Sequence, residues 1–272
     1  MNRLSAWPRH LAMAAAIMLG SVMPAHTQTA SPEIARELAP TGKLRVAVLM
    51  LSYFAVEDEA SGQPKGVIPD LGMELARRIG VPYEPVRIKN PVAMIDAFRT
   101  GAVDAAFIGI TADRAAAFDF GPIAIGIQTT FLVPAASSIK SIGEVDQAGV
   151  RIVVPQRSAQ EAHLKKIITK ATMIPVPVET PQPAIELIAA GRADVFSHVV
   201  PMLATAQPSL PGSRILPGSY YHVPIAIGYP KGQSAAVAEF CKSFVESVKA
   251  SGFVQQAIDR MGVKAQGLVV YP

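Results

Sequence analysis

Apolar and polar positions follow the same pattern in two segments of the chain. Residues 91–111 read PVAMIDAFRTGAVDAAFIGIT, and residues 181–201 read PQPAIELIAAGRADVFSHVVP. In each, a proline opens an amphipathic stretch, a glycine (Gly101 or Gly191) ends it, and an apolar run follows. Proline at the start and glycine at the end are typical of a short helix, and an unbroken apolar run is typical of a buried parallel strand. The pattern therefore predicts one helix–strand unit used twice.

The segments upstream of the two copies also correspond. GKLRVAVLM at 42–50 and GVRIVVPQR at 149–157 each predict a strand with basic flanks, followed by a loop and a helix. The second of these helices begins with an S-x-x-E capping box made of Ser158 and Glu161. Two β-α-β units in tandem predict an α/β fold with two lobes, and the cleft between facing lobes is a place for a small molecule.

The chain is expected to pass between the lobes twice. GIQTTFLVP at 126–134 predicts a strand that leaves the first lobe, and IAIGYPKG at 225–232 predicts one that returns. We therefore expect crossovers near 134–137 and near 219–226, and paired crossovers of this kind act as hinges. The boundaries that follow are a first lobe of residues 31–134 and 222–272 and a second lobe of residues 135–221.

The first thirty residues predict a secretory signal peptide. Arg3 and Arg9 precede or flank the start of an apolar stretch from Leu11 to Met23, and no Asp or Glu occurs in residues 1–30. An uncleaved anchor is the alternative, but the stretch is short for a membrane span. Because the one cysteine, Cys241, lies far downstream, no lipid anchor is expected after cleavage. We expect a periplasmic protein that is not a lipoprotein.

Composition narrows the function further. The chain has 272 residues, of which 50% are hydrophobic and 17% charged, so two lobes with ample core are possible. A formal charge of +4 without Lys/Arg runs argues against a nucleic-acid partner. One cysteine excludes an internal disulfide, and its helical apolar neighbours predict a core position. No metal-ligand spacing and no phosphate loop appear, so we expect neither a metal nor a cofactor.

Four segments follow predicted strand ends, where parallel α/β units bind ligands. The segments are Ser52-Tyr53-Phe54, Thr111 to Arg114, Gln156-Arg157-Ser158 and His198-Val199. Arg114 carries a planar cation suited to a carboxylate, and the hydroxyl of Thr111 can share the same anion. The alternative is a surface ion pair of Arg114 with Asp113 or Asp119, which spacing alone favours.

Over residues 41–262 the chain resembles the periplasmic solute-binding proteins of amino-acid ABC importers. The resemblance is carried by GKLRVAV, KGVIPDLGMELARRIG, GITADRAAAFDF and GRADV. It implies the two-lobed periplasmic-binding-protein fold of type II, a monomer without enzyme activity, and a membrane permease as partner. It also implies that Arg114, in the T-x-x-R match, binds the carboxylate of a small solute, with Thr111 beside it.

Three departures from the family pattern bear on the ligand. Arg157-Ser158-Ala159 replaces the usual Gly-Ser-Thr, so Ser158 is either a simple N-cap or part of an anion site to which Arg157 adds charge. Val199 stands where amino-acid binders usually carry an aspartate for the ammonium, which favours anions over plain α-amino acids. His198 beside it is either a ligand contact or a core histidine.

The third departure is the shortened aromatic segment after the first strand. Tyr53 and Phe54 remain there, and the sequence does not separate stacking on a ligand from anchoring of a loop. Asp104 and Asp194, in contrast, begin the two repeated strands on the side away from the cleft, where we expect them to bind turn amides.

Two other classes of protein stay open at this point. The same scaffold is used by periplasmic dehydratases of prephenate-like acids, which need an acid in the cleft, and Glu57, Asp58 and His198 are the candidates. A receptor sensor module would need a transmembrane or kinase segment, and the sequence shows none. The sequence does not identify the ligand.

Overall fold

The computed structural model describes residues 30–177 and 180–272. The expected signal peptide lies outside these residues except for Ala30. The helices are α1 (Pro32–Leu38), α2 (Val67–Ile79), α3 (Pro91–Arg99), α4 (Ala112–Ala117), α5 (Ala159–Ile167), α6 (Gln182–Ala189), α7 (Val200–Ala206), α8 (Ala235–Ala250) and α9 (Phe253–Met261), with short 3-10 turns η1 (Ile142–Glu144), η2 (Gln207–Ser209) and η3 (Gly262–Ala265). Within this described part, no helix is both long and apolar enough to span a membrane.

The strands build one large sheet and one small hairpin. They are β1 (Leu44–Leu49), β2 (Val56–Glu57), β3 (Pro64–Lys65), β4 (Tyr83–Ile88), β5 (Ala105–Gly109), β6 (Phe118–Val133), β7 (Arg151–Pro155), β8 (Thr172–Val176), β9 (Val195–Val199), β10 (Arg214–Ile215), β11 (Tyr221–Pro230) and β12 (Leu268–Val270). The large sheet has the order β4-β1-β5-β11-β6-β9-β7-β8, with β10 and β12 pairing to β6. Strand β1 is parallel to β4 and β5, and β7 is parallel to β8 and β9.

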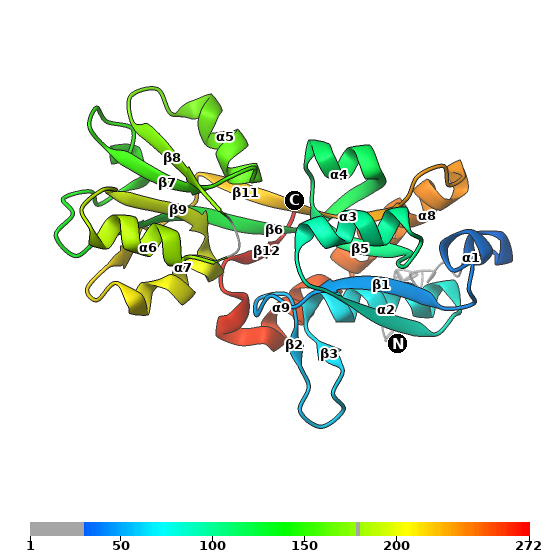
Figure 1. The fold of residues 1–272 in the computed structure, drawn as a ribbon. Helices are drawn as coiled ribbons and strands as arrows, with labels where there is room; N and C mark the ends of the chain where they lie inside the picture. The colour runs from blue at the N-terminus through cyan, green and yellow to red at the C-terminus, as the bar shows by residue number, and fades with distance from the viewer. Residues whose placement is uncertain (1–29, 178–179) are drawn as a thin grey trace, which may run out of the picture.

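Two halves with helices around parallel strands lie side by side, joined by β6 and β11 (Figure 1). The apolar side chains form separate clusters on the two faces of the sheet in each half, which explains the unbroken apolar runs of the inner strands. The expected two-lobed α/β fold is confirmed. Cys241 is fully buried in the core of the first half, as its neighbours predicted.

The joining strands are longer than the sequence suggested. β6 has 16 residues and runs antiparallel to β11 from the Thr129–Tyr221 pair to the Phe118–Pro230 pair. β6 pairs with β9 of the second half from Thr129 onward, whereas β11 pairs with β5 of the first half from Ile225 onward. Strand β6 thus begins to pair with the second half at Thr129, before the crossover that was expected near 134–137. The lobe boundaries themselves remain a prediction.

Both copies of the repeated pattern form the predicted helix–strand unit. They are α3 with β5 and α6 with β9. The glycines that follow the helices have left-handed backbones, with φ of 65° at Gly101 and 64° at Gly191. Because a side chain is strained in that region, glycine is the residue that lets the chain turn back into the strand.

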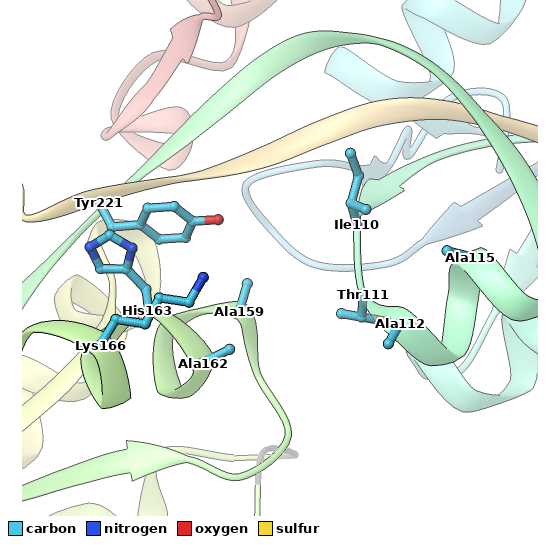
Figure 2. A pocket seen from close by; sticks show the side chains of 9 residues that line it. All are labelled: Ile110, Thr111, Ala112, Ala115, Ala159, Ala162, His163, Lys166 and Tyr221. Atoms are coloured by element: carbon cyan, nitrogen blue, oxygen red, sulfur yellow. The ribbon is translucent and has the colours of Figure 1, made fainter.

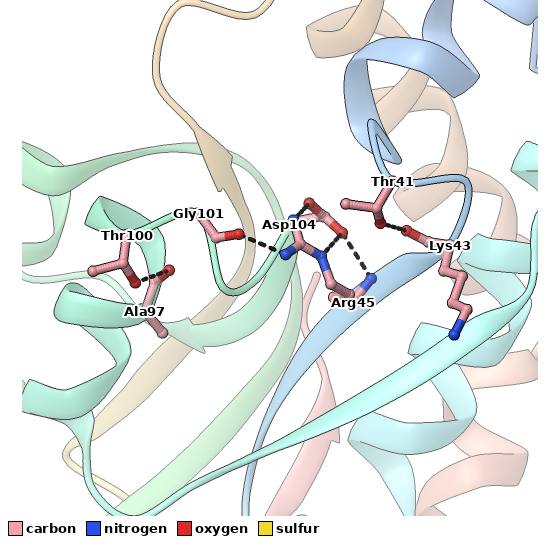
Figure 3. Close-up of polar contacts among 7 residues, drawn as sticks. All are labelled: Thr41, Lys43, Arg45, Ala97, Thr100, Gly101 and Asp104. Atoms are coloured by element: carbon pink, nitrogen blue, oxygen red, sulfur yellow. Dashed lines mark hydrogen bonds and ion pairs between the residues drawn. The ribbon is translucent and has the colours of Figure 1, made fainter.

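Asp104 and Asp194 bind an arginine on the neighbouring strand in the same way. The Asp104 carboxylate accepts hydrogen bonds from Nε (2.9 Å), Nη2 (2.6 Å) and the backbone amide (2.9 Å) of Arg45, as Figure 3 shows. Asp194 accepts from the same three groups of Arg151 at 2.9, 2.9 and 2.8 Å. The prediction that these aspartates bind turn amides was therefore wrong. The amides they bind belong to arginines on strands, and each aspartate also forms a bidentate salt bridge with the guanidinium of the same arginine.

The two pairs differ in burial, which allows a matched test. The side chains of Arg45 and Asp104 are 19% and 4% exposed, against 38% and 35% for Arg151 and Asp194. Breaking a buried pair leaves an uncompensated charge, so Asp104→Ala should lower the free energy of unfolding by about 3–5 kcal/mol. Asp194→Ala should cost about 1 kcal/mol, because solvent replaces the lost partner. Urea unfolding of both variants measures the difference, and equal losses would contradict the burial argument.

Candidate functional site

A cleft of about 420 Å³ lies between the two halves of the molecule. The first half contributes Ile110 and Thr111, which follow β5, and part of α4, and the second half contributes one face of α5, as Figure 2 shows. Tyr221, on the joining strand β11, completes the lining. The lining residues are Ile110, Thr111, Ala112, Ala115, Ala159, Ala162, His163, Lys166 and Tyr221.

The wall from the first half is built by the segment that leaves β5. Thr111 has an extended backbone and caps α4, because its Oγ1 accepts the backbone amide of Arg114 at 3.4 Å. The hydroxyl accepts in this bond and can still donate to a ligand. Sequence analysis expected Thr111 in the site, and it does line the cleft.

Arg114 is half-buried, and its guanidinium has N–H donors that the described residues leave free for a ligand. Its Nη1 donates to the carbonyl of Gly109 at 2.6 Å, and no salt bridge to it occurs in residues 30–177 and 180–272. Asp119, one partner of the surface-pair alternative, binds Lys231 instead at 3.1 Å. Burial lowers the pKa of the Arg114 guanidinium, and Asp113 opposes part of that effect. Arg114 does not itself line the described cleft, but it lies on α4 beside Thr111, Ala112 and Ala115, which do. A desolvated cation of this kind is stabilised by an anion that reaches it.

The wall from the second half is one face of α5. Ala159, Ala162, His163 and Lys166 are spaced as neighbours on a helix surface, and all four line the cleft. Ser158 caps this helix, accepting the Glu161 amide at 3.0 Å and donating to the carbonyl of Pro155 at 2.6 Å. The N-cap role predicted for Ser158 is confirmed, and its hydroxyl proton is engaged inside the protein.

Arg157 precedes the cap in a strained conformation. Its φ of 57° is the left-handed region, where a side chain costs about 1–2 kcal/mol. Its backbone amide donates to Glu161 Oε2 at 2.5 Å. In an ordinary capping box this carboxylate would accept the amide of the N-cap residue, here Ser158, but it accepts the amide of Arg157. The side chain of Arg157 is exposed and does not line the described cleft. Its role in anion binding remains a prediction.

The three other residues expected from the sequence lie in the interior. Tyr53 and Phe54 are 7% and 4% exposed, with ring centroids 4.7 Å apart in the core of the first half. His198 is 7% exposed, its Nδ1 accepts the Val199 amide at 2.8 Å, and burial lowers its pKa to about 3. None of the three lines the described cleft, so the geometry favours loop anchoring and a neutral core histidine.

Neighbouring positions that the sequence analysis weighed are also placed away from the cleft lining. Val199 is 3% exposed and packs in the apolar core of the first half. Glu57 pairs with Arg87 at 2.9 Å and Asp58 with Lys65 at 3.2 Å, both at the β2–β3 hairpin. The acids considered for a dehydratase are therefore held in salt bridges on that hairpin.

His163, Lys166 and Tyr221, which give the second wall its polar groups, were not expected from the sequence. The imidazole of His163 stacks on Tyr221 with ring centroids 4.3 Å apart and planes 15° apart. Burial lowers the pKa of His163, and the charge of Lys166 lowers it further. The lining contains no carboxylate, so the cleft is positive or neutral throughout. The helical spacing of residues 159, 162, 163 and 166 after a cap was the available signal.

Comparison with known proteins agrees with this architecture. Residues 44–263 match the model of the bacterial extracellular solute-binding proteins, family 3. No curated protein matches the chain.

Solved structures share the fold at low sequence identity. A protein from Wolinella succinogenes, described as a binding component of an ABC transporter and complexed with lysine, is 22% identical with a TM-score of 0.63, covering 82% of this chain and 96% of its own. An ancestral amino-acid-binding protein, a precursor of cyclohexadienyl dehydratase, is 24% identical with a TM-score of 0.61, covering 84% and 98%. An amino-acid ABC transporter substrate-binding protein from Streptococcus pneumoniae, bound to L-arginine, is 19% identical with a TM-score of 0.60, covering 82% and 96%.

The His163 environment makes a prediction for NMR titration. We expect its imidazole to titrate below its ordinary value of about 6.5, because burial and Lys166 both disfavour the imidazolium. Lys166→Gln removes one cause and should move the midpoint upward, whereas Lys165→Gln should leave it nearly unchanged. His198 should stay neutral down to pH about 3. A titration midpoint of His163 that is the same in Lys166→Gln as in the unmodified protein would contradict the proximity of the two side chains on this wall.

Proposed function

The chain belongs to the bacterial extracellular solute-binding proteins of family 3, and from this membership we propose that it is the solute-capturing subunit of an ABC importer. Its ligand is an amino acid or a related small carboxylate held between the two lobes. The observation that carries this proposal is Arg114, a half-buried guanidinium on the helix that forms one wall of the cleft. Thr111 at the cap of that helix adds a hydroxyl for the same group.

The cleft chemistry favours an anionic solute over a plain or cationic amino acid. The structural relatives solved with lysine and with L-arginine bind cations, but the lining of this cleft offers no carboxylate to an ammonium or guanidinium. Val199 is buried in an apolar cluster and provides no charge there. An ammonium enclosed without an acceptor pays a desolvation penalty, so neutral α-amino acids are expected to bind weakly.

The proposal includes how the protein reaches its solute and passes it on. The signal peptide would direct export to the periplasm and then be removed, leaving a chain without a lipid anchor that acts as a monomer. Closure of the lobes about the β6–β11 pair would enclose the solute, and a permease in the inner membrane would receive it.

The protein is proposed to bind its solute without converting it. An enzyme on this scaffold needs an acid placed in the cleft, and no carboxyl side chain lines the cleft. Glu57 and Asp58 are engaged at the hairpin, and His198 is buried and neutral. Incubation with prephenate-like acids should therefore yield no product.

Substitution of Arg114 tests the proposed capture directly. A thermal-shift screen of the mature protein against amino acids, dicarboxylates and aromatic acids identifies a solute, and calorimetry measures its affinity. Arg114→Ala should abolish detectable binding, because loss of a charge-assisted pair in a closed site costs about 2–5 kcal/mol. Its melting temperature should stay within a few degrees, and Arg99→Ala, an exposed arginine in the same lobe, should bind normally. Unchanged affinity in Arg114→Ala would remove the basis of the proposal.

A further inference from the structure

We infer that the second wall of the cleft carries its own anion-binding position, formed by Lys166 and His163, so that the preferred solute has two acidic groups. This inference rests on the proposed capture of a carboxylate by Arg114 and specifies the class of solute. The first acidic group would meet Arg114 and Thr111 on one lobe, and the second would meet Lys166 on the other.

Two adjacent lysines on α5 differ in whether they form a salt bridge, and this difference supports the assignment. Lys165 and Lys166 are adjacent, but Lys165 binds Glu161 at 2.7 Å, while Lys166 lines the cleft. Among the described residues no carboxylate lies within salt-bridge distance of Lys166. On α5, Lys165 is thus neutralised by Glu161 of the first turn, whereas the charge of Lys166 remains available to the solute.

His163 complements Lys166 as a neutral donor. Its ring is held against Tyr221, which belongs to the strand that joins the lobes, and Figure 2 shows the histidine and Lys166 on the same wall. Because its pKa is lowered, the imidazole is neutral at pH 7 and can donate one hydrogen bond to an acidic group. Stacking fixes the ring, so little entropy is lost when the bond forms.

The charges of the two walls explain why two acidic groups are preferred. Closure would bring the wall that holds Arg114 toward the wall that holds Lys166. No carboxylate lines the described cleft, and the one acid that acts on Arg114 is its chain neighbour Asp113. A solute with one acidic group leaves one cation without a partner in a site from which water is excluded, which is unfavourable. A solute with two acidic groups satisfies both. The alanines of both walls, Ala112, Ala115, Ala159 and Ala162, leave room for it to span the cleft.

Matched acids and amides test the inference by calorimetry. Succinate, glutarate, aspartate and glutamate are each compared with their monoamide, which keeps the size and removes one charge. At least one diacid should bind the unmodified protein about ten- to a hundredfold tighter than its monoamide, as expected for one hydrogen-bonded charge pair. Lys166→Gln should shrink this preference to about threefold or less, whereas Lys165→Gln, with the same charge change on the same helix, should preserve it.

The outcomes separate this inference from the proposed function. Monoamides that bind as tightly as the diacids, with binding still lost in Arg114→Ala, would leave the proposed function intact and overturn the inference. A diacid preference that survives Lys166→Gln would overturn it as well. If none of these acids or amides binds, both the inference and the capture of a carboxylate are contradicted. Melting temperatures within a few degrees of the unmodified protein show that the variants are folded.

Discussion

The antiparallel pairing of β6 with β11 is the interaction on which the rest of the molecule depends. The two strands lie side by side over most of β11, and each continues into a different set of parallel strands. Strand β12 pairs with residues 125–127 of β6, just before the residues of β6 that pair with β9. Because backbone hydrogen bonds hold this region in register, the proposed closure would take place by bending and twisting about it. In that proposal the walls of the cleft approach each other and keep their alignment.

The two ends of the parallel strands have different roles. At the amino ends, Arg45–Asp104 and Arg151–Asp194 tie neighbouring strands together with the same set of hydrogen bonds in each lobe. At the carboxyl ends of β5 and β7 the chain leaves the sheet through the caps of α4 and α5, and among the described residues neither Arg114 nor Lys166 on these helices forms a salt bridge. The ion pairs at the amino ends tie neighbouring strands together, and the cations at the carboxyl ends are those proposed to meet the solute.

Local patterns predicted much of this fold, and long-range packing set the rest. The repeated helix–strand units, the glycine turns and the capping of α5 by Ser158 follow from spacing and turn chemistry, which act over a few residues. The first half of β6 was missed because Gly121 and Pro122 signal a break. The strand continues past them, and its pairing with β11 has an irregularity at this point, between the Phe120–Gly228 and Ile123–Ala226 pairs. The contact of His163 with Tyr221 joins distant segments and has no local signal beyond the helical spacing of its own face.

The candidate site was predicted in part for the same reason. Thr111 follows a strand end and lines the cleft, whereas Tyr53, Phe54 and His198 also follow strand ends or lie near them and are buried. Position along a strand indicates which edge of the sheet a residue occupies, whereas exposure depends on how the loops above it pack. The face of α5 that carries Lys166 lines the cleft only because the fold sets this helix opposite α4 of the other lobe, as Figure 2 shows, and no local sequence pattern encodes that arrangement.

Small-angle X-ray scattering of the mature protein, with and without a solute that calorimetry shows to bind, tests the central claim most directly. The one tryptophan, Trp7, lies in the expected signal peptide, so scattering is preferable to tryptophan fluorescence. If two lobes close on an acidic solute about β6 and β11, the radius of gyration should fall on saturation. A radius of gyration that stays the same at full saturation would contradict capture by closure of the cleft.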